Sequence, residues 1–275
     1  MPDPIPVDAY ALIIGAMKCG TSSLYDYLQG HPEICPAVTK EPEYFSENQN
    51  HKRHVERYQD LWSFDAAVHR YALEASTGYT KYPEEPNVAS NIHAYGIRPK
   101  FIYLVRNPFD RIASHYNFMQ KNETWGLDVT HPHLINTSNY YLQLAQYRKW
   151  FPREDLLVLD FADLTDDPRR VLERTYDFLG LAHSYFPEEY TVKNPTQMKS
   201  RTEKRLKASK ISPLFRFVPK PLKRGVKSLL RRTAVPAKRV LTDGERLAIF
   251  AALREDMARL HREYGIDVQR WGFDA

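Results

Sequence analysis

The chain has 275 residues, 43 % of them hydrophobic and 13 % aromatic, and a formal net charge of +5 at pH 7. Such a chain can bury a substantial core, and its length favours one large globular domain over residues 1–275 rather than two small ones. Two cysteines are too few for a disulfide framework, and without a signal segment or an apolar stretch of roughly 20 residues we expect a cytoplasmic protein.

The first predicted elements surround Gly15. The apolar residues 10–14 are typical of a buried parallel strand, and residues 21–28 predict a helix because their hydroxyl groups can cap its first turn. The same order recurs further on, where the apolar residues 100–105 precede a helix cap at Asn107. Two strand-to-helix connections indicate an α/β fold.

The second half of the chain continues this alternation. Residues 140–150 predict a helix, residues 155–161 a strand, and residues 168–179 a helix that begins at Asp166 or Asp167. Strands that alternate with helices favour a central parallel sheet flanked by helices, with the ligand at the carboxyl ends of the strands.

Residues 195–241 form a polar, basic segment that we expect to be a long loop or lid. Its part from 199 to 239 holds fifteen Lys or Arg residues and one acidic residue, so the rest of the chain is net acidic. This distribution predicts a surface for an anionic membrane or an acidic polymer, and a solvated charged loop is the alternative.

A C-terminal helix is predicted over residues 242–264. Thr242 and Glu245 have the spacing of a capping box, and Gly265 is placed to end the helix. The apolar stripe of this helix is Leu247, Phe250, Leu253, Met257 and Leu260.

The segment GAMKCGTSS, residues 15–23, lies where the first strand meets the first helix. Backbone N–H groups and the helix dipole at such a junction hold an anion. Lys18 adds a positive charge and residues 21–23 add hydroxyl donors, so we predict a phosphate-binding loop. A nucleoside-triphosphatase loop reads GxxxxGK[ST], whereas here Lys18 precedes Gly20, and an ordinary tight turn is the alternative.

A second basic motif, RNPFDRIASHY at residues 106–116, follows the second predicted strand. Arg106 lies at the carboxyl edge of that strand, and Ser114 falls about two turns into the helix, on a face that can look back at Arg106. Together they predict a second phosphate site. For Arg111, an ordinary surface ion pair with Asp110 is the simpler interpretation.

These two motifs resemble the 5′-phosphosulfate loop and the 3′-phosphate motif of sulfotransferases that use 3′-phosphoadenosine 5′-phosphosulfate (PAPS). The segment KEPEYF, residues 40–45, is similar to the acidic element of the carbohydrate and heparan sulfate branch of that family. The resemblance implies a P-loop-like, three-layer α/β fold. It also implies transfer of a sulfuryl group from PAPS to a hydroxyl of a carbohydrate or other small-molecule acceptor, with adenosine 3′,5′-bisphosphate as product and with neither a metal nor a nucleic-acid partner.

The resemblance further implies roles for individual residues. Lys18 would stabilise the leaving oxygen, and Glu41 matches the position of the catalytic base. Glu43 could be mistaken for that base, and a solvent-exposed loop carboxylate is the non-catalytic interpretation of either. His31 and His115 are lesser candidates, because the cytosolic branch uses a histidine base. The nucleotide-binding residues would be Lys18, Cys19, Gly20, Thr21, Ser22, Ser23, Arg106, Ser114, Lys199 and Arg201.

Two positions depart from the family pattern. Cys19 replaces a small residue, which is either harmless or makes the loop sensitive to oxidation. Ala75 stands where the heparan-type branch has a lysine near the reaction centre, so the resemblance does not extend to a glycosaminoglycan acceptor.

Two functions of other classes stay open as alternatives. A nucleotide kinase or triphosphatase would use a similar loop, but Lys18 is misplaced for it and we expect no apolar strand that ends in a magnesium-binding Asp. A noncatalytic module would bind a polyanion or a membrane surface through residues 199–239.

Overall fold

The computed structural model describes residues 5–49, 55–120, 126–190 and 239–274. Its centre is a sheet of five parallel strands in the order β2-β3-β1-β4-β5. The strands are β1 (Tyr10–Gly15), β2 (Ile34–Pro36), β3 (Tyr71–Ala75), β4 (Lys100–Val105) and β5 (Leu156–Asp160). Parallel neighbours require crossover connections, which place helices over both faces of the sheet.

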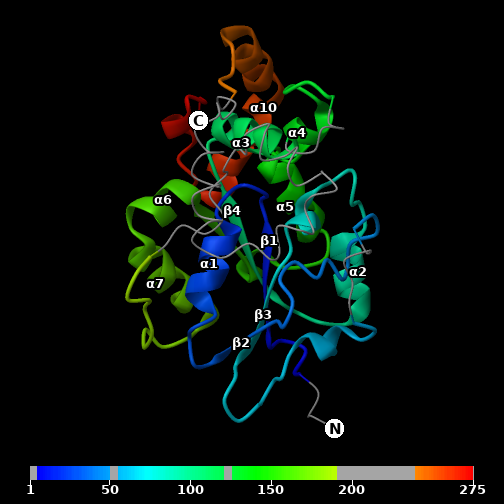
Figure 1. Cartoon of the computed structure of the whole chain (residues 1–275), viewed down its shortest axis with the longest axis vertical. Helices are drawn as coiled ribbons and strands as arrows, with labels where there is room; N and C mark the ends of the chain where they lie inside the picture. Colours follow the sequence, from blue (N-terminus) through cyan, green and yellow to red (C-terminus); the bar gives the residue numbers. More distant parts are fainter. Residues whose placement is uncertain (1–4, 50–54, 121–125, 191–238, 275) are drawn as a thin grey trace, which may run out of the picture.

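Helices cover both faces and one end of this sheet. In Figure 1, α1, α6 and α7 lie on one side of the strands and α2 and α5 on the other, while α3, α4 and α10 gather at one end. The α-helices are α1 (Thr21–Leu28), α2 (Val88–Tyr95), α3 (Pro108–Met119), α4 (Pro132–Asn136), α5 (Tyr140–Arg148), α6 (Phe161–Asp166), α7 (Pro168–Leu179) and α10 (Asp243–Tyr264). Short 3-10 helices are η2 (Tyr58–Leu61), η3 (Thr77–Thr80), η4 (Arg153–Asp155) and η6 (Val268–Trp271). The predicted α/β class, with helices on both faces of a parallel sheet, is confirmed.

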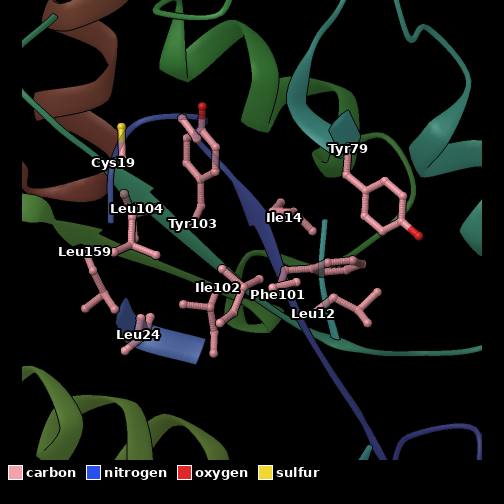
Figure 2. Close-up of a cluster of buried hydrophobic side chains, with 14 of the residues drawn as sticks. Leu12, Ile14, Cys19, Leu24, Tyr79, Phe101, Ile102, Tyr103, Leu104 and Leu159 are labelled. Carbon is pink, nitrogen blue, oxygen red and sulfur yellow. The ribbon is translucent and has the colours of Figure 1, made fainter. Parts of the chain in front are cut away.

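Successive side chains of β4 point to opposite faces of the sheet, and both faces are packed in the core. Phe101 packs against Tyr147 of α5, with ring centroids 5.0 Å apart. Ile102 and Leu104 point to the other face of the sheet, where Figure 2 shows them near Leu24 of α1. All five side chains are buried, because alternate residues of a strand enclosed on both faces must all be apolar.

Most of the predicted elements are confirmed with small changes of boundary. β5 ends at Asp160, since Phe161 begins α6 instead of extending the strand. Asp167 caps α7 by accepting a bond from the Arg170 N–H, and α10 begins with the predicted capping box. No helix in the described ranges is long and apolar enough to cross a membrane.

One part of the predicted apolar stripe of α10 is wrong. Leu247 is 70 % exposed, whereas Ile249, which the prediction omitted, is fully buried. Leu247 lies two residues before Ile249, so it is on nearly the opposite side of the helix from the buried face. The predicted lid at residues 195–241 lies outside the described residues except at its last three positions.

Candidate active site

The predicted phosphate loop joins β1 to α1 at the carboxyl edge of the sheet. Gly20 is the N-cap of α1 with a φ of +88°, and a Cβ at this position would lie 2.7 Å from the Phe161 ring. A glycine therefore suits both the conformation and the close packing of the loop. No side chain caps α1 within the described structure, so N–H groups of its first turn can bind an anion.

Arg106 connects the two predicted anion motifs. It follows β4 directly, and its guanidinium donates a hydrogen bond to the Lys18 carbonyl oxygen at 3.3 Å. The guanidinium also lies 4.8 Å from the centroid of the Phe161 ring, and the Tyr140 hydroxyl donates to the Arg106 carbonyl at 2.7 Å. The loop after β1 and the start of α3 therefore form one basic surface.

Lys18 adds a positive charge to this surface. Its backbone is in the left-handed region, with a φ of +73°. Its Nζ lies 4.9 Å from the centroid of the Phe118 ring of α3. Ser114 is half-buried on the same helix. The predicted groups for the two phosphates thus come from neighbouring elements, whereas Lys199 and Arg201 lie outside the described residues.

The interpretation of Arg111 as a surface ion pair is wrong. Its side chain is fully buried, and it donates to the Ser138 hydroxyl and the Leu134 carbonyl, both at 2.5 Å, and to the Met17 carbonyl at 3.5 Å. Asp110 lies instead 4.0 Å from Arg106. Arg111 therefore holds the phosphate loop against α3 and the segment at α4, and each of its three guanidinium nitrogens has an acceptor.

Residues 40–46, here called the acidic loop, meet the phosphate loop at its edge. The Lys40 ammonium donates a hydrogen bond to the Ser22 hydroxyl. Glu41 is half-buried, and its N–H donates to the Ala75 carbonyl at the end of β3 at 3.1 Å. Glu41 and the phosphate loop thus lie at the same edge of the sheet. The sequence placed Lys40 in the KEPEYF element but predicted no role for it in the site.

Glu43 differs from Glu41 in its surroundings. It is fully buried, so a solvent-exposed carboxylate is the wrong interpretation for this residue. Its carboxylate accepts hydrogen bonds from the Gly78 N–H and from the Ser46 hydroxyl, both at 2.8 Å. Such a buried group is occupied by internal donors, whereas a base must reach the acceptor proton.

The two candidate histidines are buried and engaged. His31 lies beyond the end of α1, with Nε2 3.0 Å from the Ala182 carbonyl and Nδ1 accepting from the Glu33 N–H. In α3, Nδ1 of His115 lies 3.1 Å from the Arg111 guanidinium. Burial, and then the charge of Arg111, hold the pKa of His115 well below its usual range. This geometry favours Glu41 over either histidine as the base.

The Cys19 side chain is fully buried beneath the phosphate loop, with Sγ 3.9 Å from the Tyr140 hydroxyl. Burial raises the pKa of the Cys19 thiol to about 11, although Arg111 and Arg106 oppose the increase. A thiol with so little thiolate reacts slowly with oxidants. The structure therefore supports the harmless interpretation of this departure.

The largely apolar strand β5 ends in an Asp, Asp160, whose surroundings bear on the kinase or triphosphatase alternative. Its carboxylate accepts a bond from the Ala162 N–H at 2.9 Å and lies 3.8 Å from Arg270, so it caps α6 and faces a cation. The described residues contain no group of three or more His, Cys, Asp or Glu placed to hold a metal ion.

The fold and this edge define a class of protein: a parallel α/β protein with an anion-binding loop after its first strand and a second basic motif beside it. Residues 8–224 match the sulfotransferase domain family, and the chain belongs to that family.

Known proteins with similar sequences act on heparan sulfate, according to their names. The chain is 30 % identical over 198 residues to heparan sulfate glucosamine 3-O-sulfotransferase 3B1 of Homo sapiens, covering 64 % of this chain and 48 % of the relative. It is 26 % identical over 199 residues to the bifunctional heparan sulfate N-deacetylase/N-sulfotransferase 4 of Mus musculus, covering 63 % of this chain and 22 % of the relative. The chain thus spans about half or less of the length of these relatives.

A solved structure extends the likeness over nearly the whole chain. The sulfotransferase from Alicyclobacillus acidocaldarius superposes with a TM-score of 0.62 at 22 % identity, covering 96 % of this chain and 98 % of that protein. At this level of identity the likeness establishes the fold.

Proposed function

We propose that this protein is a sulfotransferase that transfers a sulfuryl group from PAPS to a hydroxyl of a carbohydrate or other small-molecule acceptor. The observation that carries the proposal is the contact between the two anion motifs, in which Arg106 donates to the Lys18 carbonyl. PAPS carries phosphosulfate at its 5′ position and phosphate at its 3′ position, and a ligand with two anionic ends suits two adjoining basic motifs.

The residues of the phosphate loop suit such a ligand. The glycine N-cap leaves first-turn N–H groups of α1 for the 5′ end, and Ser22 and Ser23 bring further donors. Arg106 and Ser114, on the neighbouring motif, would hold the 3′-phosphate. When bound, PAPS supplies the sulfuryl group.

Two side chains would act on the reacting atoms. Lys18 places positive charge where the oxygen that leaves sulfur becomes negative, and Glu41 accepts the proton of the acceptor hydroxyl. The bond from Lys40 to Ser22 joins the loop that carries Glu41 to the loop that carries Lys18. Proximity of this kind lowers the barrier because the reacting groups need no further search for the right orientation.

The acceptor is expected to be a carbohydrate or another hydroxyl-bearing small molecule. The names of the relatives favour a carbohydrate. Ala75 closes β3 with a buried, uncharged side chain at the position of the heparan-type lysine, so we leave a sulfated glycosaminoglycan chain out of the proposal.

Isothermal titration with three ligands tests the donor. We expect adenosine 3′,5′-bisphosphate to bind with a Kd on the order of micromolar and ATP to bind much more weakly. Equal or tighter binding of ATP would instead support a kinase or triphosphatase. Binding of heparin without binding of the bisphosphate would support a noncatalytic polyanion module. Sulfation of an acceptor from a carbohydrate and small-molecule screen completes the test.

A further inference from the structure

The acidic loop is fastened by a buried carboxylate that the proposed reaction does not use. Glu43 accepts from the Gly78 N–H and the Ser46 hydroxyl, and its own N–H donates to the Ser76 hydroxyl oxygen at 3.1 Å. A Cβ at position 78 would lie 2.2 Å from Oε2 of Glu43, so only glycine leaves room for the carboxylate. These bonds attach the acidic loop to the end of β3 and to η3.

A second buried carboxylate, that of Glu74 in β3, adjoins the first. Its Oε1 accepts a bond from the Ser76 hydroxyl at 2.6 Å, and its Oε2 accepts a bond from the Tyr58 hydroxyl. Ser76 therefore links the two acids, because it receives the Glu43 N–H and donates to Glu74. Hydroxyl groups can rotate, so this network accommodates Glu74 with or without a proton.

The two acids share a site of low polarity. Burial raises the pKa of Glu74 to about 7, and the charge of Glu43 adds to the increase, while hydroxyl donors lower it. The other titratable groups that bear on Glu74 are Tyr25, Tyr58, Tyr79 and Tyr147, all with pKa values raised above their usual range. These tyrosines are neutral near pH 7 and add no charge to the site. With a pKa of about 7, Glu74 is mostly protonated below that pH.

The backbone of the acidic loop depends on these contacts. Glu41 and Glu43 have φ values of +53° and +51°, in the left-handed region that residues with a Cβ avoid. The bonds of Glu43, together with the bond from the Glu41 N–H to Ala75, hold the chain in this conformation. Because a left-handed conformation is unfavourable for residues with a Cβ, we expect loss of these bonds to release the backbone that carries the Glu41 side chain.

We propose that Glu43 is a positioning residue for sulfuryl transfer: through its hydrogen bonds to Ser76 and Gly78, it fixes the acidic loop so that the Glu41 carboxylate faces the acceptor hydroxyl. The inference rests on the proposed function, in which Glu41 removes the acceptor proton. Both Glu43 and Glu74 are fully buried, so neither touches the reacting atoms. Above pH 7, ionised Glu74 repels Glu43 and loosens the loop, so kcat falls.

The first test compares wild type with Glu43→Ala and Glu43→Gln. We expect kcat to fall about 10²-fold in Glu43→Ala, since a shift of about 1 Å in a catalytic group has that effect. A fall of about 10-fold is expected in Glu43→Gln, whose side chain keeps an acceptor for the Gly78 N–H. The Kd for adenosine 3′,5′-bisphosphate should change less than about twofold in both, because the phosphate loop is untouched.

Glu85→Gln is the matched control. Glu85 is also a buried carboxylate, and it accepts bonds from the N–H groups of Glu47 and Asn48, just beyond the acidic loop. Glu85→Gln makes at this second anchor the same substitution as Glu43→Gln, without releasing Glu41. We expect kcat of Glu85→Gln at saturating PAPS to stay within about twofold of wild type.

Two further measurements separate positioning from general stability. The kcat of wild type should decline through pH 7 toward alkaline pH, and this decline should be absent in Glu74→Gln. Hydrogen exchange of the backbone at residues 40–46 should speed up in Glu43→Ala and stay unchanged in Glu85→Gln, a readout that needs no activity.

The outcomes distinguish this inference from the proposed function. Equal losses of kcat in Glu43→Gln and Glu85→Gln, or unchanged exchange at residues 40–46 in Glu43→Ala, would overturn the positioning role. A wild-type protein that binds the bisphosphate yet sulfates no acceptor would contradict the proposed function, and hydrogen exchange would still decide whether Glu43 fastens the loop.

Discussion

The position of the Lys18 side chain depends on a hydrogen bond to the Lys18 backbone. Its carbonyl is held by Arg106, so its side chain starts from a fixed place at the edge of the sheet. We expect Lys18→Ala to lower kcat by about 10²-fold or more, because no neutral group can stabilise the charge of the leaving oxygen. The measurement is PAPS-dependent turnover per bisphosphate-binding site, with the surface variant Lys149→Ala as control. Near-normal turnover of Lys18→Ala would remove the assignment.

Arg106 has two tasks that different ligands can separate. Arg106→Ala should weaken binding of adenosine 3′,5′-bisphosphate about tenfold more than binding of adenosine 5′-phosphosulfate, which lacks the 3′-phosphate. A smaller loss shared by both ligands is expected, since the same side chain also holds the Lys18 carbonyl. Titration calorimetry with both nucleotides gives the contrast, and equal losses would limit Arg106 to supporting the loop.

The sequence indicated the residues of the candidate site better than their surroundings. Lys18 was predicted because it lies in the loop between a recognisable strand and a helix, and Arg106 because it directly follows another such strand. The burial of Glu43 could not be predicted, since it depends on Ser76 and Gly78, which lie more than thirty positions later in the chain. Arg111 was misread for the same reason, because its acceptors come from Met17 and from the segment at α4.

Among the elements, β1 and β4 were predictable because both strands are buried on both faces and, apart from Lys100 at the start of β4, contain no charged side chain. β3 was missed, since the charged Glu74 interrupts its apolar pattern and only the folded network around Ser76 satisfies that charge. β2 has three residues, too few to show a period. Strand order likewise depends on contacts between distant segments.

The junction of β1 and α1 gives a prediction for an element boundary. Gly20→Ala should destabilise the protein by about 2 to 4 kcal/mol, since it adds a left-handed strain of about 1 to 2 kcal/mol and a clash with Phe161 of similar size. Gly96→Ala is the matched control: its φ of +90° is nearly the same, but a Cβ there meets nothing within 4 Å. The difference between the two variants in the free energy of unfolding, measured with urea, gives the cost of the clash alone. Equal losses would mean that the Phe161 ring moves aside.

For the whole molecule, the buried Glu74 predicts how the free energy of unfolding depends on pH. Its pKa rises from 4.5 to about 7 on folding, so the native state binds the proton more tightly than the unfolded state. The stabilisation is complete below about pH 4.5 and is lost as pH rises through about 7, a change of about 3 kcal/mol.

Glu74→Gln should remove this part of the pH dependence. Unfolding by urea at about pH 5 and about pH 8 should therefore show a smaller difference for the variant than for wild type. Burial also raises the pKa of Asp256, to about 6, so this residue makes the free energy of unfolding fall with pH in the same direction. Asp256 is present in both proteins, so its contribution cancels when they are compared. Identical slopes for the two proteins would contradict the raised pKa of Glu74.

The burial of both cysteines has a practical consequence for optical studies of the protein. The chain contains only Cys19 and Cys35, and neither thiol is accessible. A cysteine introduced at Val240, a position that is 83 % exposed and follows a residue bonded to α3, can therefore carry a fluorophore without removal of the native thiols. We expect maleimide to label Val240→Cys within minutes and wild type only on unfolding, as mass spectrometry would record. We expect the fluorescence emission of this label to change when a nucleotide binds at the basic surface, so the conjugate would report binding.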